Sequence, residues 1–193
     1  MRNLVRTSSV AAVLIAALAI GSPNEKLLTG ASSGSSAQYE TATLAGGCFW
    51  SLQETLRHIP GVIKTTVGYT GGTVPKPTYE MVAGGKTGHT EAVEVVYDPT
   101  KLSYEQLLTD FLTSRDPTGQ TTGAGRSHRS AIFYHNEEQK QAAERVKGKI
   151  NRSGRWNAPI ATEITKATEF YPAEEYHQDY LQKIAAHSCR APD

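Results

Sequence analysis

The most reactive side chains of this 193-residue sequence are its two cysteines, Cys48 and Cys189. Cys48 follows Gly46-Gly47, at the point where a β-rich segment gives way to a helical apolar pattern. A thiol in the first turn of a helix lies among free backbone N–H groups and a partial positive charge, which stabilise a thiolate. Cys48 is therefore a candidate nucleophile, although a buried packing cysteine would produce the same pattern.

A second candidate for chemistry is Glu91, near the start of an alternating segment from Thr90 to Tyr97. Glu91 shares one face of this predicted strand with Val93 and Val95. Burial disfavours the ionised form of a carboxyl, so the pKa of a carboxyl on such a face rises and the group can serve as a general acid at neutral pH. The alternative is an exposed strand end, or a carboxylate paired with a base.

Two aromatic residues, Phe49 and Trp50, follow the first thiol directly. Phe49 fits the apolar stripe of the predicted helix, whereas Trp50 lies off that stripe and could form the wall of an apolar pocket. The histidines show no metal-binding spacing such as H-E-x-x-H, so no metal site is predicted. A hydrolase that pairs Cys48 with His89 or His177 stays open as an alternative.

The elements that must position these side chains alternate between strand and helix patterns. We expect strands at residues 39–45, 62–69, 90–97, 129–135 and 160–170. We expect helices over residues 49–59, 103–112 and 136–154, one helical turn at 78–83, and a last helix that begins at Pro172. Several strands are too closely spaced for crossover helices, which indicates an α+β class. We predict a two-layer α/β sandwich with a ferredoxin-like core, in which helices pack on a mixed sheet.

The overall charge of the chain is nearly balanced. Lys and Arg number 20 against 19 Asp and Glu, for a net charge of +1. Nucleic-acid surfaces and polybasic membrane binders carry a clear excess of positive charge, so we expect neither. Two cysteines are also too few for a disulfide scaffold.

The N-terminus has the pattern of a targeting signal. Arg2 and Arg6 precede an apolar run from Val10 to Ile20, which is shorter than the ~20 residues that cross a bilayer. We expect a signal peptide at residues 1–21, a flexible linker at residues 22–38, and one domain at residues 39–193 whose C-terminal tail carries Cys189. The predicted location is periplasmic or secreted, with an uncleaved anchor as the alternative and without stable membrane insertion.

Several motifs resemble the A-type peptide methionine sulfoxide reductases, which act on the S epimer. Gly46-Gly47-Cys48-Phe49-Trp50 resembles the G-C-F-W signature of that family. Similar blocks follow in the same order over about residues 40–189, namely Gly68-Tyr69-Thr70-Gly71-Gly72, Pro77-Thr78-Tyr79, Gly88-His89-Thr90-Glu91-Ala92-Val93, Arg129-Ser130-Ala131-Ile132-Phe133-Tyr134 and His177-Gln178-Asp179-Tyr180-Leu181.

The resemblance implies a thiol-dependent enzyme that reduces methionine-S-sulfoxide, in proteins or free, and so repairs proteins after oxidation. Cys48 would attack the sulfoxide sulfur and become a sulfenic acid. Glu91 would protonate the sulfoxide oxygen, and Tyr79 would donate a second hydrogen bond to it. Phe49 and Trp50 would form the pocket for the substrate methyl group.

The resemblance also implies how the enzyme is regenerated. Cys189 would attack the sulfenic acid on Cys48 to form a disulfide, which thioredoxin or a thioredoxin-like dithiol protein would reduce. No metal and no bound organic cofactor are implied. We expect a monomer whose partners are oxidised proteins or free methionine sulfoxide and the external reductant.

The segment at residues 118–128 departs from the family pattern. It is short, it lacks an Asp, and His128 stands where the family has a Tyr that contacts the sulfoxide oxygen; Gln53 also stands where a Glu is frequent. Loss of a hydrogen bond to a developing charge can cost roughly 10²-fold in rate. Either His128 replaces the Tyr in binding substrate, or the chain is a degenerate member that binds substrate with little turnover.

Overall fold

The computed structural model describes residues 38–119 and 123–188 of the chain. The predicted signal peptide, the predicted linker up to residue 37 and Cys189 lie outside the described residues. None of the described helices has the length and apolar character needed to cross a bilayer.

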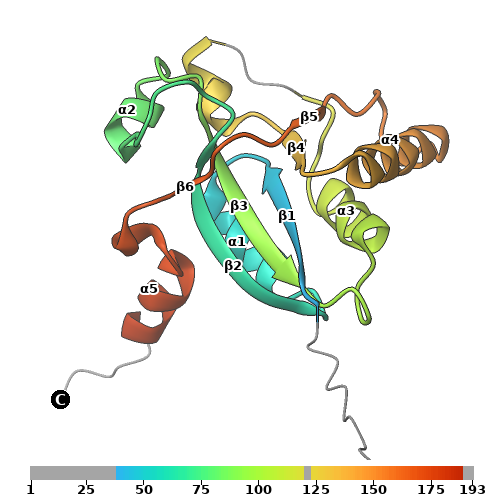
Figure 1. Ribbon diagram of the computed structural model, residues 1–193, viewed down its shortest axis with the longest axis horizontal. Helices are drawn as coiled ribbons and strands as arrows, with labels where there is room; N and C mark the ends of the chain where they lie inside the picture. The colour runs from blue at the N-terminus through green and yellow to red at the C-terminus, as the bar shows by residue number, and fades with distance from the viewer. Residues whose placement is uncertain (1–37, 120–122, 189–193) are drawn as a thin grey trace, which may run out of the picture. The chain divides into compact units, whose positions relative to one another are not determined.

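A six-stranded sheet in the order β5-β4-β1-β3-β2-β6 forms the framework (Figure 1). Its strands are β1 (Glu40–Ala45), β2 (Val62–Thr70), β3 (Thr90–Tyr97), β4 (Ala131–Tyr134), β5 (Glu163–Lys166) and β6 (Tyr171–Pro172). Only β5 runs parallel to its neighbour β4, and the other neighbouring pairs are antiparallel. The sheet is therefore mixed, as the sequence predicted.

The helices connect these strands in the order of a ferredoxin-like fold. They are α1 (Phe49–Arg57), α2 (Tyr79–Ala83), α3 (Tyr104–Thr113), α4 (Glu137–Arg152) and α5 (Tyr180–Ser188), with short 3-10 turns η1 (Gly123–His128) and η2 (Glu175–His177). The path β1-α1-β2-β3-α3-β4 with spatial order β4-β1-β3-β2 is the split β-α-β pattern. The predicted α+β class and ferredoxin-like core are confirmed.

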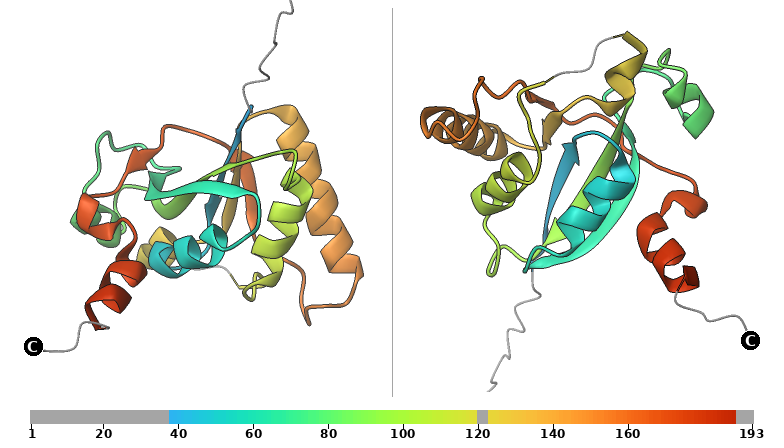
Figure 2. Two further views of the ribbon diagram at one scale, coloured as in Figure 1. Left: turned by 90° about the horizontal axis from the view of Figure 1, so that it is seen from below. Right: turned by 180° about the vertical axis from the view of Figure 1, so that it is seen from behind.

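Helix α1 packs on β2 and β3, and α3 packs against α4 beside β4 and β5 (Figure 2). Apolar residues of α1 recur three and four positions apart, so one face of the helix is buried against the sheet through Leu52 and Leu56. Val93 and Val95 of β3 meet them in the same core. Each such buried side chain stabilises the fold by about 1.5–3 kcal/mol.

Helix starts agree with the capping residues in the sequence. The Ser103 hydroxyl accepts a hydrogen bond from the Gln106 N–H, and the Asn136 side chain accepts one from the Gln139 N–H. These contacts satisfy donors that have no partner within the helix. The predicted starts of α3 and α4 are confirmed.

The prediction that the last helix begins at Pro172 is wrong. Tyr171–Pro172 form β6, which pairs with Gly68 and Tyr69 at the edge of the sheet, and α5 begins only at Tyr180. Proline has no N–H to donate, and an edge strand tolerates it because only one side of that strand pairs with a neighbour. Gly68 permits this pairing, because a Cβ there would lie 2.4 Å from the Tyr171 carbonyl oxygen.

The strand predicted at residues 160–170 is also shorter than expected. Only Glu163–Lys166 form β5, which pairs residue by residue with the four residues of β4. A strand extends only as far as a neighbour supplies backbone partners. The alternating pattern of residues 160–170 could not show how short that neighbour is.

Candidate active site

The Cys48 thiol lies at the N-terminal end of α1, where Cys48 is the capping residue. Gly47 has φ of +77°, a conformation that glycine adopts at little cost, and it turns the chain from β1 into the helix. Cys48 is a free cysteine and is half-buried, and its carbonyl accepts the Leu52 N–H. The predicted place of the thiol at the start of a helix is confirmed.

Glu91 lies at the start of β3 and is only 3% exposed. Its Oε2 accepts a hydrogen bond of 2.9 Å from the Phe49 N–H, one residue after Cys48. Its Oε1 lies 3.3 Å from His128 Nε2. Burial raises the pKa of Glu91, while the Phe49 N–H and His128 act in the opposite direction. The carboxyl is thus both buried, as its strand face predicts, and in contact with a base.

Tyr79 approaches the same group from α2. Burial raises the pKa of Tyr79, and the negative charges of Glu91 and Cys48 raise it further. The phenol therefore lies within electrostatic reach of both groups and remains a hydrogen-bond donor at neutral pH. Its backbone N–H donates to Glu174 Oε1 at 3.0 Å, which fixes the start of α2.

Aromatic rings form the wall beside the thiol. The Trp50 indole stacks on Tyr180, with ring centroids 3.9 Å apart and an interplanar angle of 15°. The Trp50 Nε1–H donates to His177 Nδ1 at 3.1 Å, and the Phe49 ring lies 5.1 Å from the His177 ring. Trp50 thus leaves the core stripe of α1 in order to pack against the C-terminal part of the chain.

His177 is a neutral, buried imidazole that orients this wall. An indole N–H can only donate, so Nδ1 is the acceptor and the ring proton lies on Nε2. Burial lowers the pKa of His177, and Glu174, whose Oε2 lies 3.9 Å from Nε2, partly opposes this. Glu174 also accepts the Tyr69 hydroxyl at 2.8 Å. No pattern in the sequence indicates this supporting role of Glu174.

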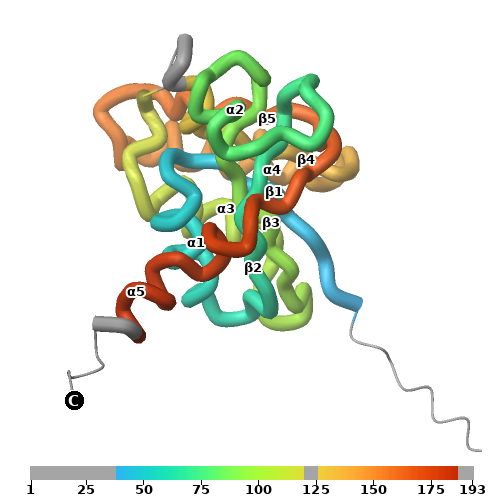
Figure 3. The backbone as a smooth tube through the Cα atoms, turned by 90° about the vertical axis from the view of Figure 1, so that its left-hand side faces the viewer, coloured from blue at the N-terminus to red at the C-terminus, as the bar shows by residue number. Residues whose placement is uncertain are grey.

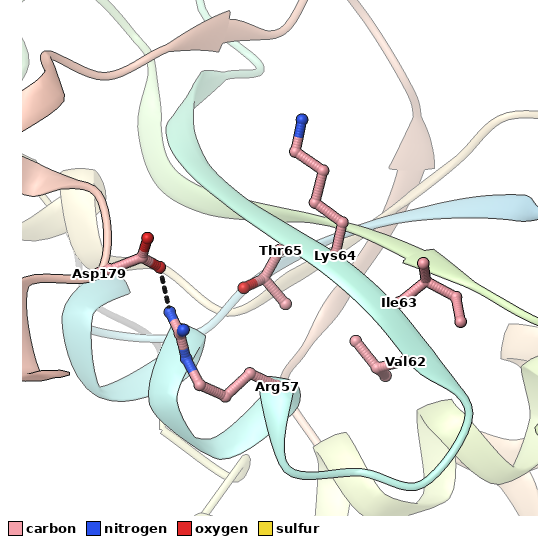
Figure 4. A pocket seen from close by; sticks show the side chains of 6 residues that line it. All are labelled: Arg57, Val62, Ile63, Lys64, Thr65 and Asp179. Carbon is pink, nitrogen blue, oxygen red and sulfur yellow. Dashed lines mark hydrogen bonds and ion pairs between the residues drawn. The ribbon is translucent and has the colours of Figure 1, made fainter.

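The segment that leads into α5 is fastened to α1 and β2. The Gln178 carboxamide accepts the Val67 N–H and donates to the Val67 carbonyl. The Asp179 N–H donates to Gln53 Oε1 at 3.0 Å, and Arg57 Nη2 donates to Asp179 Oδ1 at 2.5 Å. Arg57 and Asp179 both line a pocket beside β2 (Figure 4). Helix α5 therefore lies beside α1 (Figure 3).

The departure at Gln53 has a structural explanation. Its side chain is buried, and besides accepting the Asp179 N–H it donates through Nε2 to the Thr65 carbonyl at 3.3 Å. A carboxylate could still accept the Asp179 N–H, but it could not donate to the Thr65 carbonyl. The amide therefore joins α1, β2 and the start of α5.

The segment at residues 118–128 carries His128, which stands in the place of the Tyr that contacts the sulfoxide oxygen. This segment is described in part, since residues 120–122 are outside the described ranges. Turn η1 brings His128 to the site, where its carbonyl accepts the Gly47 N–H at 3.2 Å. The His128 side chain is 43% exposed, and its Nδ1 lies 3.2 Å from the Ser127 hydroxyl. One edge of the imidazole therefore faces Glu91, while much of the side chain is open to solvent.

The two histidines that a hydrolase would need are engaged elsewhere. His177 Nδ1 is occupied by Trp50, and His89 accepts the Gly72 N–H while its other ring nitrogen meets the Val74 carbonyl. These contacts give no support to a Cys–His pair. Within residues 38–119 and 123–188, no three potential metal-ligating side chains cluster together.

Comparison with known proteins identifies the family. The family model described as "Peptide methionine sulfoxide reductase" matches residues 40–192, nearly the whole described part of the chain. The chain belongs to this family. The recognised motifs are therefore those of a peptide methionine sulfoxide reductase, and the α+β framework is the one that carries them.

Individual relatives agree with this assignment. Peptide methionine sulfoxide reductase MsrA of Listeria innocua is 51% identical over 151 residues, which cover 77% of this chain and 85% of the relative. Among solved structures, methionine sulfoxide reductase A of Corynebacterium diphtheriae has a TM-score of 0.64 at 36% identity and covers 78% and 76% of the two chains. Reduced Mxr1 of Saccharomyces cerevisiae has a TM-score of 0.69 at 31% identity, covering 77% and 87%.

The yeast protein has also been solved in complex with Trx2. In that structure it has a TM-score of 0.53 to this chain at 28% identity, and the match covers 75% of this chain and 86% of the yeast chain. The family framework is thus retained in a relative that is bound to its partner.

Proposed function

We propose that this peptide methionine sulfoxide reductase reduces methionine-S-sulfoxide, in proteins or free, with Cys48 as the nucleophile and Glu91 as the acid. The observation that carries the proposal is the hydrogen bond from the Phe49 N–H to Glu91, which holds a buried carboxyl one residue from the thiol. Family membership supplies the reaction class.

The reaction is a two-electron exchange between two sulfur atoms. The Cys48 thiolate attacks the sulfoxide sulfur while Glu91 transfers its proton to the sulfoxide oxygen, and Tyr79 donates a hydrogen bond to the same oxygen. Oxygen passes to Cys48, which becomes a sulfenic acid, and methionine leaves with its sulfur reduced. The raised pKa of Glu91 supports its role, since only a protonated carboxyl can supply the proton.

His128 takes the place of the family's tyrosine in this proposal. Its Nε2 lies 3.3 Å from the buried Glu91 carboxyl, while 43% of its side chain is exposed. The imidazole can therefore donate to the sulfoxide oxygen and return a proton from solvent to Glu91 after each turnover. This contact also supports an active enzyme over a degenerate binder, because the position of the missing phenol is occupied by another donor.

Phe49 and Trp50 provide the proposed pocket for the substrate methyl group. Both lie directly after the thiol on α1, and His177 and Tyr180 hold the Trp50 ring through a hydrogen bond and a stacking contact. An aromatic wall binds an apolar methyl group in preference to a polar group, because binding removes apolar surface from water. The pocket thereby aligns the sulfoxide sulfur with Cys48.

Cys189 is the proposed resolving cysteine. It follows α5, whose first residue stacks on Trp50 beside the nucleophile. Attack of the Cys189 thiol on the Cys48 sulfenic acid expels water and leaves a disulfide. The yeast relative in complex with Trx2 supports a thioredoxin-like dithiol as the reductant of that disulfide. We also propose that the chain acts as a monomer, which light scattering would test.

The proposed place of action is outside the cytoplasm. Residues 1–21 would be removed as a signal peptide, and residues 22–38 would link the domain to the cleavage point. The reductant would then be an extracytoplasmic dithiol protein. A fusion of residues 1–40 to a reporter should be exported, and a reporter that stays wholly in the cytoplasm would contradict this part of the proposal.

A stereospecific assay tests the proposed activity. The purified chain with dithiothreitol should reduce the S epimer of a methionine sulfoxide peptide over many turnovers and leave the R epimer unchanged. A degenerate binder would bind the S epimer without steady turnover. A Cys–His hydrolase would cleave an ester substrate and would not consume sulfoxide.

A further inference from the structure

Arg115, just after α3, is a cation beside the nucleophile that the reaction described above does not use. Its Nη1 donates to the carbonyl of Gly46. The same nitrogen is 3.8 Å from the place that a Cβ on Gly47 would occupy. The guanidinium therefore lies against the two residues that precede Cys48 and fix its place at the end of α1.

The surroundings of Arg115 contain no matching carboxylate within the described part of the chain. Its Nε is buried there without a hydrogen-bond partner. Arg129 is more deeply buried, and its Nε also lacks a hydrogen-bond partner, but that Nε lies 3.5 Å from Glu163 Oε2 and the guanidinium donates to backbone carbonyls. A charge withdrawn from water is costly unless an opposite charge or several hydrogen bonds compensate it.

When it is ionised, Cys48 is a negative charge that acts on Arg115. Burial lowers the pKa of Arg115, and the negative charge on Cys48 acts in the opposite direction. An arginine stays protonated at every pH at which the enzyme works, so its attraction for a thiolate is constant. The helix end supplies only partial charges, whereas Arg115 supplies a full one.

We propose that Arg115 is a positioning residue for Cys48, whose guanidinium favours the thiolate form and holds the Gly46-Gly47 turn. The inference rests on the proposed function only in that Cys48 is the nucleophile. It predicts a specific dependence on pH. Loss of the guanidinium should slow reactions of Cys48 where the thiol is mostly protonated, and should have no effect where it is fully ionised.

The test is the rate of alkylation of Cys48 by iodoacetamide between pH 5 and pH 10. The full-length chain carrying Cys189→Ser is the parent, because Cys48 is then its only thiol. In Arg115→Met the midpoint of the profile should move up by about one pH unit, with alkylation about tenfold slower at low pH and unchanged at the alkaline plateau. Arg115→Lys keeps the charge and should restore most of the shift.

Control variants separate this effect from a change in net charge or in folding. Arg145→Met removes an exposed guanidinium that pairs with Glu105, and its profile should match the parent. Arg115→Gln serves if Arg115→Met does not fold, since it retains a donor for Gly46 and lacks the charge. The titratable side chains near Cys48 on other elements are unchanged throughout: Tyr79, on which both Glu91 and Cys48 act, and His128, which contacts Glu91.

Two results would overturn the inference. One is a profile of the neutral Arg115 variants that superimposes on the parent; the other is an equal shift in Arg115→Lys and Arg115→Met. Neither result depends on sulfoxide reduction. If the chain failed to reduce the S epimer while the alkylation midpoint moved as predicted, the proposed function would fail and the role of Arg115 would stand.

Discussion

The two ends of β3 both bury a polar side chain, but they provide it with different neighbours. At one end Tyr97 is 0% exposed, and its hydroxyl donates to Glu40 Oε2 at 2.5 Å. At the other end Glu91 accepts the Phe49 N–H and faces His128. Burial raises the pKa of Tyr97 and of Glu91, yet only Glu91 lies at the candidate active site.

The difference lies in what each buried proton can do. The Tyr97 proton is held in a bond to one carboxylate, and a raised pKa simply keeps it there. In the proposed mechanism the Glu91 proton lies beside the nucleophile Cys48, and the partly exposed His128, which contacts the carboxyl, connects it to solvent. We infer that a buried titratable group needs reactive and exchangeable neighbours to act in catalysis, and that burial alone is insufficient.

The largest effect that this comparison predicts is at the thiol itself. Cys48→Ser should lower sulfoxide reduction by roughly 10⁴-fold or more, because a hydroxyl cannot replace the thiolate as a nucleophile. Cys189→Ser is the matched control, since without a reductant it should release one methionine per chain and then stop. Methionine release measured without and with dithiothreitol distinguishes the two variants, and sustained turnover by Cys48→Ser with dithiothreitol would contradict the assignment.

Next in size is the loss of the proton at the Glu91 end of β3. Glu91→Gln keeps the shape of the side chain and its hydrogen bond from Phe49, but it removes the acid. We expect kcat/KM for the S epimer to fall roughly 10²–10⁴-fold. An activity close to that of the parent would show that another group supplies the proton.

A smaller effect is expected where the aromatic wall is held. Trp50→Phe removes the hydrogen bond to His177 and part of the stacking on Tyr180 while keeping an apolar ring. We expect KM to rise about tenfold, which corresponds to about 1.4 kcal/mol, with a lesser change in kcat. If kcat fell instead and KM stayed constant, Trp50 would act on the chemical step and not on binding.

The pH dependence of stability should also differ between the two ends. Because the pKa of folded Glu91 is raised above 4.5, the unfolded chain loses this proton at lower pH than the folded one. The contribution of Glu91 to the free energy of unfolding is therefore complete below about pH 4.5 and is lost as pH rises through the folded pKa. Denaturant unfolding of the parent and Glu91→Gln should show the parent weakening relative to the variant over that rise.

The smallest effect is predicted at the structural end. Tyr97→Phe deletes only the hydroxyl that donates to Glu40, so the free energy of unfolding should fall by about 1 kcal/mol while kcat/KM stays within twofold. A loss of activity comparable to that of Glu91→Gln would remove the distinction between the two ends. Urea unfolding and steady-state assays on the same preparation provide both values.

Local sequence patterns account for much of this architecture. The spacing of Phe49, Leu52 and Leu56 predicted α1, and the alternation around Glu91 predicted both β3 and the burial of the carboxyl. In these cases the residues that form the pattern all lie within one helix or strand. The capping residues Ser103 and Asn136 are equally local.

The remainder depends on contacts between distant parts of the chain. Arg115 meets Gly46 across 69 residues and His177 meets Trp50 across 127, so no periodicity in either segment indicates the contact. The late start of α5 has the same origin, because Asp179, with φ of +54°, is fixed by a buried side chain of α1. Such features are set by tertiary packing and become visible only in the folded protein.

The central claim is that Cys48 takes the sulfoxide oxygen with a proton from Glu91, and a single turnover tests it most directly. The chain carrying Cys189→Ser, mixed with excess S-epimer substrate and no reductant, should release one methionine per chain and leave one sulfenic acid, trapped by dimedone on Cys48. Adding Glu91→Gln should slow that step by the factor seen in kcat/KM. Methionine formed without a dimedone adduct on Cys48 would contradict the account.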